Sequence, residues 1–309
     1  MEQRQLGRTG LMVSKLSFGA SSLGGVFREI DEAEAIRTVQ VALDLGLNLI
    51  DVSPYYGLTR AETVLGKALA GVPRERYLLA TKVGRYGADQ FDFSAARVTR
   101  SVDESLARLG LDHIDLIQCH DIEFVPLAQV VDEALPALRR LQAQGKVRFV
   151  GITGLPLAIY PAIMEQAPVD TILSYCHCSL NDTTLLDLLP YLQRHEVGVI
   201  SASPLSMGLL GNRGAPAWHP APAEVIAACA RAADYCRERG ASLPKLAVQY
   251  AVAQPGIHTT VVGSASPQHM RDNVAWLDEP LDQELLDGVL AILAPIRNVT
   301  WPSGLPENQ

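Results

Sequence analysis

The sequence has no long apolar run and no tract rich in basic residues. A helix that spans a bilayer needs about 20 consecutive apolar residues, and the amino terminus MEQRQLGRTG lacks the basic-then-apolar order of a signal peptide. We therefore expect no membrane association and a cytoplasmic location. A net charge of −8 without a Lys/Arg-rich tract argues in the same way against nucleic acid and anionic membranes. A small molecule is the better expected partner.

Cysteines are few and show no pairing pattern. The chain has five, none in a CxxC pair: Cys119, Cys176, Cys178, Cys229 and Cys236. An odd set without such pairs argues against a disulfide framework and fits a reducing compartment. The CHC stretch at 176–178 could suggest a metal site, but no second cluster of ligands has zinc-like spacing. We expect no metal.

Short strand-like runs alternate with longer amphipathic segments through most of the chain. The expected strands span 16–19, 48–52, 77–82, 114–119, 147–152, 170–174, 197–201 and 258–263. Apolar residues at three- and four-residue intervals predict helices at 32–45, 94–109, 127–144 and 224–239. These helices are followed by glycines that suit a left-handed end: Gly46, Gly110, Gly145 and Gly240. The alternation predicts an α/β fold, a (β/α)8 TIM barrel.

An open, doubly wound sheet would show the same alternation. No GxGxxG follows the first strand, because the glycines of GASSLGG stand at 19, 24 and 25, the wrong spacing for a pyrophosphate turn. No Pro/Gly/Ser linker divides the chain, so we expect residues 1–309 to form a single domain, with 211–224 as a long βα loop. Residues 5–15 predict a β-hairpin that closes the bottom of the barrel, and an extra C-terminal helix and tail are expected after 281.

Several residues that can carry chemistry stand at the expected strand ends, which meet at one mouth of a barrel. In chain order these ends hold Asp51, Lys82, His120, Thr153, Ser174, Ser201, Ser203, Gly263 and Ser264. Each has an ordinary explanation: Asp51 could cap a turn, Lys82 could be solvated, and His120 could be an edge-of-core histidine. The two tyrosines of DVSPYYG could pack against the rim. Taken together these explanations are less convincing, because an Asp, a Lys and a His stand at three successive strand ends. The Tyr stands in the loop after the first of these ends.

Such a set has a chemical use. A phenol with a pKa of about 10 is a poor acid or base at neutral pH, but a nearby ammonium group lowers that pKa. A carboxylate can keep the ammonium charged and close, and a histidine can orient a substrate oxygen. The set would then move a proton to or from an alcohol or carbonyl oxygen. A lysine at a strand end also suits a Schiff-base aldolase, which would leave Tyr56 and His120 without a role.

The chain resembles the aldo-keto reductases over nearly its whole length. The resemblance lies in NLIDVSPYYG, LLATKVG, HIDLIQCHD, KVRFVGITG, GVISASPLSMGLL and VVGSASPQHMRDN. It implies a catalytic tetrad of Asp51, Tyr56, Lys82 and His120, since the family's tyrosine directly precedes the glycine. Tyr55 would then line the mouth. Some barrels of this family are channel partners, but no extra basic or apolar docking segment stands at the amino terminus to suggest that role.

Within the family the chain is most similar to the L-galactose dehydrogenase branch. That similarity lies in FDFSAARVTRSVDESL, CHDIEF, GITGLPL, ILSYCH, LLDLLPYL, VISASPL and TWPSG. It implies oxidation at C1, to the aldonolactone, of L-galactose or of L-fucose, which has the same ring stereochemistry. The implied substrate contacts are Tyr55, His120, Asp121 and Trp301. The alternative is an NADPH-dependent reductase of small aldehydes or ketones, and the expected assembly is a monomer or a weak homo-oligomer.

The resemblance also implies a nicotinamide cofactor. The residues expected to bind it are Thr153, Ser174, Ser203, Leu205, Gly208, Gly263, Ser264, His269, Asp272 and Asn273. Thr153 and Ser174 would hold the carboxamide, and Ala202 stands where the family often stacks a tyrosine. Relatives that use NADP offer a lysine and an arginine to the 2′-phosphate where this chain has Gly263 and His269. Each missing charge-assisted bond is worth about 1.5–3 kcal/mol, so we expect NAD, with NADP as the weaker alternative.

Overall fold

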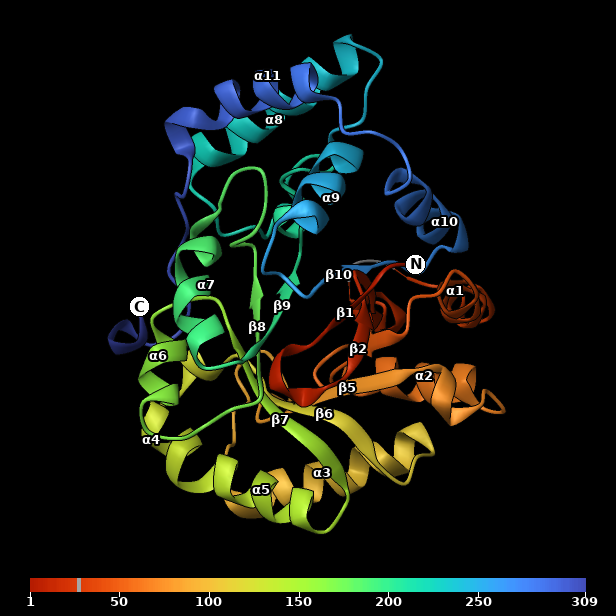
Figure 1. The fold of residues 1–309 in the computed structure, drawn as a ribbon, viewed down its shortest axis with the longest axis vertical. Helices are drawn as coiled ribbons and strands as arrows, with labels where there is room; N and C mark the ends of the chain where they lie inside the picture. The colour runs from red at the N-terminus through yellow and green to blue at the C-terminus, as the bar shows by residue number, and fades with distance from the viewer. Residues whose placement is uncertain (27–28) are drawn as a thin grey trace.

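The protein folds as a closed barrel of parallel strands surrounded by helices (Figure 1). The computed structural model describes residues 1–26 and 29–309. In these residues eight strands close the barrel in the order β10-β3-β4-β5-β6-β7-β8-β9. They are β3 (Leu16–Gly19), β4 (Leu49–Asp51), β5 (Leu78–Val83), β6 (Ile114–Cys119), β7 (Val147–Gly154), β8 (Thr171–Tyr175), β9 (Gly198–Ala202) and β10 (Thr259–Gly263). All match the expected strands within two residues, which confirms the (β/α)8 barrel.

The helices form the outer layer of the molecule. They are α1 (Glu32–Asp44), α2 (Arg60–Leu69), α3 (Ala95–Leu109), α4 (Leu127–Gln129), α5 (Leu135–Ala143), α6 (Ile159–Met164), α7 (Thr184–Arg194), α8 (Ala223–Glu238), α9 (Leu243–Ala253), α10 (Pro267–Trp276) and α11 (Gln283–Leu293). The expected helix ends are confirmed, because Gly46, Gly110, Gly145 and Gly240 all have positive φ angles. α11 confirms the extra C-terminal helix, and the long loop before α8 is also present.

One expected helix, 127–144, is irregular in its first half. A π-helical segment, Val130–Ala134, separates α4 from α5. Pro136 is the second residue of α5, which begins directly after this segment. A proline inside a helix has no N–H and collides with the carbonyl four residues earlier, and a wider π-turn relieves that collision. The sequence predicted the helix but not this change of geometry.

An N-terminal hairpin closes the bottom of the barrel, as expected (Figure 1). β1 (Gln3–Gln5) pairs with β2 (Met12–Ser14) in antiparallel register. Leu6 and Val13 pack inside the barrel against residues from its strands, such as Leu116. Gly7, in the turn, has a φ of +50°, and a Cβ there would collide with the backbone before β9. Only glycine allows the hairpin to approach so closely.

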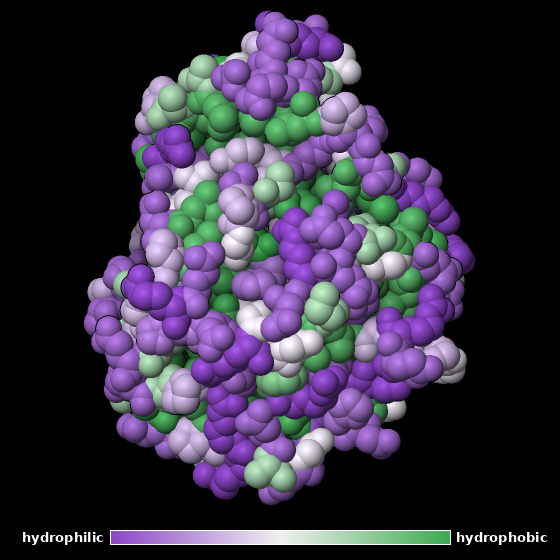
Figure 2. Space-filling view, in the orientation of Figure 1, coloured by the Kyte–Doolittle hydropathy of each residue, from purple (hydrophilic) through white to green (hydrophobic). Residues whose placement is uncertain are grey.

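The core has an inner and an outer part. Inward-facing aliphatic residues of the strands and the hairpin fill the bottom of the barrel, and larger apolar clusters lie between the strands and the helices. A further cluster joins α8, α9 and α11 to Trp301 of the tail. Figure 2 shows hydrophilic residues over most of one face, with hydrophobic residues exposed in small patches, as near α8 and α11 at the top. In the described residues, no helix combines the length and apolar character needed to cross a membrane.

Candidate active site

Side chains alternate between the inside and the outside of the barrel, and this alternation selects which residues reach the mouth. In β5, Ala80 belongs to the interior cluster and Leu79 to the outer core. Lys82, two residues after Ala80, therefore also points into the barrel. The parallel register places it beside Gln118 of β6, and His120 follows two residues later. Asp51, Lys82, Gln118 and His120 thus lie on neighbouring strands at one mouth.

Lys82 is held in a buried ion pair. Its Nζ donates to Asp51 Oδ1 at 2.5 Å and to the carbonyl oxygen of Val52 at 2.9 Å, and the lysine side chain is only 1% exposed. Gln118 Nε2 donates to the other oxygen of Asp51 at 2.9 Å. Burial disfavours the charged lysine, but Asp51 and Tyr56 outweigh this effect, so the pKa of Lys82 is raised. Lys82 therefore stays an ammonium group.

Tyr56 is the tyrosine that lies beside Lys82. The Lys82 Nζ is 5.1 Å from the centroid of the Tyr56 ring. Burial raises the pKa of Tyr56 to about 12, while the charge of Lys82 opposes that rise. The expected net lowering of this pKa is therefore wrong for the protein alone, because desolvation of the phenolate exceeds the attraction of the ammonium group.

The YYG loop is fixed by a close approach of two backbones. Gly57 has a φ of +61°, and a Cβ there would collide with the backbone of Gly24. Gly24 also has no room for a side chain, because a Cβ would lie 2.7 Å from the Tyr56 carbonyl oxygen. This contact between the first two βα loops keeps Tyr56 turned toward Lys82.

His120 is buried and neutral. Its Nδ1 is 2.9 Å from Ser53 Oγ, and its Nε2 is 3.5 Å from Asp121 Oδ2. The ring stands edge-on to the Tyr56 ring, with centroids 5.6 Å apart. Burial lowers the pKa of His120 to about 3; Lys82 and Arg85 act in the same direction, and Asp121 opposes them. The ring can therefore donate one hydrogen bond and accept one.

Tyr55 has a different environment from Tyr56. Its hydroxyl accepts a hydrogen bond from Arg85 Nη2 at 3.3 Å, and the Arg85 guanidinium lies 4.0 Å from the centre of the Tyr55 ring. Arg85 also pairs with Asp121 at 2.5 Å. Tyr55, Arg85 and Asp121 thus form one polar wall beside His120. Of the two tyrosines, only Tyr56 is coupled to Lys82.

Sequence reasoning missed three polar residues of this site: Ser53, Arg85 and Gln118. Gln118 had a usable signal, since it is a polar residue in the apolar run LIQC, two positions before His120. Arg85 had a weaker one, as the second basic residue of KVGR. Ser53 had none, because a serine in a loop before proline is common in turns.

The two residues expected to hold the carboxamide have opposite orientations. Thr153 continues the inward series of β7, and its Oγ1 accepts a hydrogen bond from the Asp121 N–H at 3.0 Å. Ser174 follows Leu173, which faces the barrel interior, so Ser174 points outward. Its hydroxyl lies beside the phenol of Tyr160, a residue of the outer core. The structure therefore supports Thr153 and not Ser174 at the mouth.

Gly263 and Gly19 form an open cradle at the ends of β10 and β3, where they are paired in register. A Cβ on Gly263 would lie 3.2 Å from the Gly19 carbonyl oxygen and 3.4 Å from Ser21 Oγ. Because neither glycine has a Cβ, a ligand can approach the backbone there closely, with the Ser21 hydroxyl nearby. Helix α10 begins just beyond, and the N–H groups at its start suit a dinucleotide.

The residues around α10 expected to bind the cofactor do lie at this end of the barrel. Ser264 Oγ accepts a hydrogen bond from the Ser266 N–H at 3.1 Å and is 3.3 Å from His269 Nδ1. Asp272 accepts a hydrogen bond from Gln268 at 2.8 Å along the helix surface. Asn273 is half-buried in the next position. The set provides hydroxyl, imidazole and amide groups.

The loop after β9 has an unusual backbone. Ser203, Ser206 and Met207 have positive φ angles of 57°, 49° and 52°, followed by Gly208 at 106°. Such angles cost energy in residues with a Cβ and are found mainly where surrounding structure enforces them, often at ligand sites. The Leu205 carbonyl accepts a hydrogen bond from the Gly208 N–H at 3.0 Å and helps to fix the turn. These residues include three expected to bind the cofactor.

Trp301 is held in place by the C-terminal tail. The tail is tied to the 3-10 turn after β6, because Asn308 Nδ2 donates to the carbonyl oxygen of Glu123 at 2.9 Å. Burial raises the pKa of Glu123 itself to about 8. Trp301 is buried and stands edge-on to His219, with ring centroids 4.9 Å apart. It therefore supports the long loop after β9 more than it offers a free surface.

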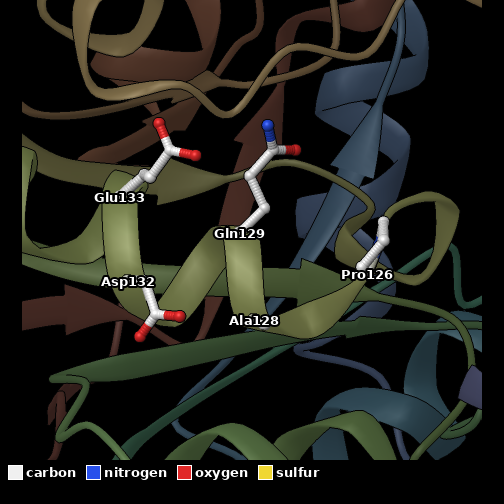
Figure 3. A pocket seen from close by; sticks show the side chains of 5 residues that line it. All are labelled: Pro126, Ala128, Gln129, Asp132 and Glu133. Atoms are coloured by element: carbon white, nitrogen blue, oxygen red, sulfur yellow. The ribbon is translucent and has the colours of Figure 1, made fainter.

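Two other features lie outside this group of residues. A pocket on α4 and the π-helical segment is lined by Pro126, Ala128, Gln129, Asp132 and Glu133 (Figure 3). None of these was expected in the site. The CHC stretch places His177 Nδ1 3.1 Å from Asp182, and all five cysteines are buried free thiols. Within residues 1–26 and 29–309, no group of three His, Cys, Asp or Glu could hold a metal ion.

A closed barrel with a buried lysine and histidine and a partly buried tyrosine at its mouth is typical of barrel enzymes that act on a substrate oxygen. The chain belongs to the aldo/keto reductase family, whose model matches residues 15–293. It is therefore an oxidoreductase, and the family uses nicotinamide cofactors.

Comparison with individual proteins supports the same assignment to a family of oxidoreductases. The chain is 52% identical to an L-galactose dehydrogenase of Arabidopsis thaliana, over 100% of this chain and 99% of that protein. It is 35% identical to a D-arabinose 1-dehydrogenase of Saccharomyces cerevisiae, over 95% of each. The solved holo form of an aldo-keto reductase from Bacillus halodurans superposes with a TM-score of 0.79 at 28% identity, covering 98% of this chain and 99% of that one. These similarities confirm the expected family and branch.

Proposed function

We propose that this protein oxidises an L-galactose-configured aldose, L-galactose or L-fucose, at C1 to the aldonolactone, with NAD as the electron acceptor. The buried Asp51–Lys82 pair beside Tyr56 carries this proposal. It is the arrangement needed to accept a proton from a sugar hydroxyl. The similarity to an L-galactose dehydrogenase over the whole chain supports the choice of sugar.

In the proposed reaction, the Tyr56 phenolate removes the proton of the C1 hydroxyl. The C1–O bond becomes a carbonyl as the hydrogen on C1 leaves with its electron pair. A bound oxidised nicotinamide would supply the acceptor for this hydride. Lys82 stabilises the phenolate, and Asp51 and Gln118 hold Lys82 in place. Neutral His120 hydrogen-bonds the same substrate oxygen and orients it.

The proposed sugar contacts are Tyr55, His120 and Asp121. Tyr55 and Asp121 both contact Arg85, so hydroxyl donors and acceptors line one side of the mouth. Such a wall suits a ring with several hydroxyl groups better than a small aldehyde. Trp301 bounds the substrate space from the tail, through the loop that it supports.

The residues present fit a dinucleotide, and NAD is the proposed form. Thr153 lies beside His120 and Asp121, where the nicotinamide end is required. The loop that includes Ser203, Leu205 and Gly208, with the Gly263 cradle, is proposed for the ribose and phosphates. Ser264, His269, Asp272 and Asn273 are proposed for the adenosine end. No lysine or arginine stands at 263 or 269 to pair with a 2′-phosphate.

A substrate screen with both cofactors tests this proposal. L-galactose, L-fucose, D-arabinose and simple aldehydes are each assayed with NAD and NADP, or with their reduced forms, and the product is identified as lactone or alcohol. We expect the highest kcat/KM with an L-galactose-configured sugar and NAD. Efficient reduction of aldehydes with NADPH, without sugar oxidation, would instead establish the alternative reductase. Tyr56→Phe serves as the inactive control.

A further inference from the structure

Ser53 is buried directly beside His120 and has few possible partners. It lies in the loop after β4 and is 0% exposed. Its Oγ accepts a hydrogen bond from the Tyr55 N–H at 3.1 Å and lies 2.9 Å from His120 Nδ1. In the described part of the chain, the hydroxyl has no other hydrogen-bond partner than these two. Where its single proton points therefore determines which nitrogen of His120 carries the hydrogen.

Two arrangements of the neutral ring are possible. In the first, the Ser53 hydroxyl donates to Nδ1, and the imidazole hydrogen is on Nε2. In the second, Nδ1–H donates to Ser53, which leaves the buried hydroxyl proton without an acceptor. The second arrangement also turns the Nε2 lone pair toward Asp121 Oδ2, 3.5 Å away. Buried donors are rarely left unpaired, which favours the first arrangement. A ring lone pair that faces a carboxylate is repelled by it, and this also favours the first arrangement.

The structure offers little support for a doubly protonated ring. Burial, together with the charges of Lys82 and Arg85, lowers the pKa of His120 to about 3. The groups that face the ring are Ser53, Tyr55, Tyr56, Lys82, Arg85 and Asp121. Of these only Asp121 favours the imidazolium, and Arg85 pairs with it. His120 is therefore a neutral ring whose tautomer has to be fixed by a partner.

We infer that Ser53 is a positioning residue that fixes His120 as the Nε2–H tautomer, so that the ring offers a hydrogen-bond donor to the substrate oxygen beside Tyr56. The role in turnover rests on the proposed function, but the tautomer itself does not. The His120 and Tyr56 rings are neighbours, with centroids 5.6 Å apart and planes at 88°.

NMR of protein labelled with ¹⁵N-histidine tests the tautomer without any substrate. The chain has seven histidines, and comparison with His120→Gln assigns the His120 signals. We expect a protonated Nε2 and an unprotonated Nδ1 in the wild type. Ser53→Ala should give a mixed or reversed tautomer, and Ser53→Thr, which keeps the hydroxyl, should match the wild type. A protonated Nδ1 in the wild type overturns the inference, and so does an unchanged tautomer in Ser53→Ala.

Kinetics then separate a role in orienting the donor from a merely structural one. Ser53→Ala should lower kcat about 10- to 100-fold, as expected for a misdirected hydrogen-bond donor, with little change in the KM for the sugar. Ser53→Thr should recover most of the activity. A rise in KM alone would indicate that the loop has shifted after the loss of the Tyr55 contact, and it contradicts the inference.

Two controls keep the outcomes distinct. If Ser53→Ala does not fold, Ser53→Cys replaces it, because a thiol has nearly the same size but donates weakly. If the wild type oxidises none of the sugars, the proposed function fails, while the tautomer measured by NMR still decides the inference. A wild-type tautomer as expected, with full activity in a folded Ser53→Ala variant, would show that Ser53 has no positioning role in turnover.

Discussion

The two ends of the barrel each contain a buried aspartate bound to cations, and the two ion pairs differ in their surroundings. At the bottom, Asp115 pairs with Arg74 and with Arg148, the latter at 2.6 Å, and accepts a hydrogen bond from the Leu79 N–H at 2.8 Å. At the mouth, Asp51 pairs with Lys82 at 2.5 Å. The side chains of Arg74 and Arg148 are 28% and 46% exposed, whereas that of Lys82 is 1% exposed.

This difference separates a structural ion pair from one available for chemistry. Asp115, on β6, links β5 through Leu79 and β7 through Arg148. Its cations reach water, so they cost little to desolvate. The charge of Lys82 is fully desolvated and is shared between a carboxylate and a phenol. A buried pair of this kind is a poor source of stability, which indicates that the mouth is arranged for reactivity.

Tyr56→Phe tests the mouth most directly. The ring and its packing remain, but the ionisable oxygen beside Lys82 is lost, so kcat should fall about 1,000-fold or more. Cofactor affinity, measured by fluorescence titration, should persist. The matched control is Tyr55→Phe, which removes the long contact to Arg85 and a proposed sugar contact but leaves Tyr56 beside Lys82, so its effect on kcat should be mild. An inactive Tyr55→Phe beside an active Tyr56→Phe would reverse the assignment of the loop.

The pH dependence of oxidation tests the coupling between Tyr56 and Lys82. Oxidation needs the phenolate, and burial places the pKa of Tyr56 at about 12. The phenolate fraction therefore grows about tenfold per pH unit below that value, and kcat/KM should rise with pH without reaching a plateau near neutrality. Lys82→Met removes the charge that opposes this high pKa. The rise should then move to still higher pH, with a loss of about 100-fold at neutral pH.

This profile reports ionisations of the free enzyme or the free substrate, and the coupled pair titrates together. The same sugar is therefore used for both proteins, over the same range of pH. An unchanged profile in a still-active Lys82→Met variant would contradict the assignment of Tyr56 as the base. A profile that is lowered about 100-fold at neutral pH but still rises with pH agrees with it.

Much of the fold and part of the site could be predicted from the sequence. The strands were found because each is a short apolar run bounded by turn residues, and Asp51, Lys82 and His120 were found because they stand at strand ends. Side-chain direction was the weak point. Ser174 was expected at the mouth but points outward, since a shift of one residue along a strand exchanges its two faces.

Contacts between distant segments were not visible in the sequence. Gln118 enters the site through the register of β5 and β6, and Arg85 enters it from the loop after β5 through its contacts with Asp121 and Tyr55. Ser53 meets His120 from the loop after β4. The direction of the Tyr56 pKa shift also depended on burial, which the spacing of charged residues does not give. The chemical type of the site was therefore predictable, while its hydrogen-bond network was not.

The preference between NAD and NADP tests the rim of the mouth. Substitutions there should have smaller effects on kcat/KM than the substitutions of Tyr56 and Lys82. Gly263→Lys combined with His269→Arg supplies the basic partners of a 2′-phosphate, and each charge-assisted bond is worth about tenfold in affinity. The ratio of kcat/KM for NADP to that for NAD should rise accordingly. His269→Arg alone is the simpler control, because a Cβ at Gly263 would lie 3.2 Å from the Gly19 carbonyl oxygen. A wild type that already favours NADP would contradict the proposed NAD preference.

Asp115→Asn should have the smallest effect on turnover, and it tests the comparison of the two ends. The substitution keeps the shape but weakens two charge-assisted contacts to partly exposed arginines, so the free energy of unfolding should fall by about 1–3 kcal/mol. Because Asp115 shares no partner with the mouth, kcat/KM should stay within about twofold of the wild type. Asp51→Asn should differ in turnover, with a large fall in kcat, because its carboxylate holds Lys82. Urea denaturation and steady-state kinetics on both variants measure the contrast. If Asp115→Asn lost activity at full stability, the bottom of the barrel would not be the purely structural end that its exposed cations indicate.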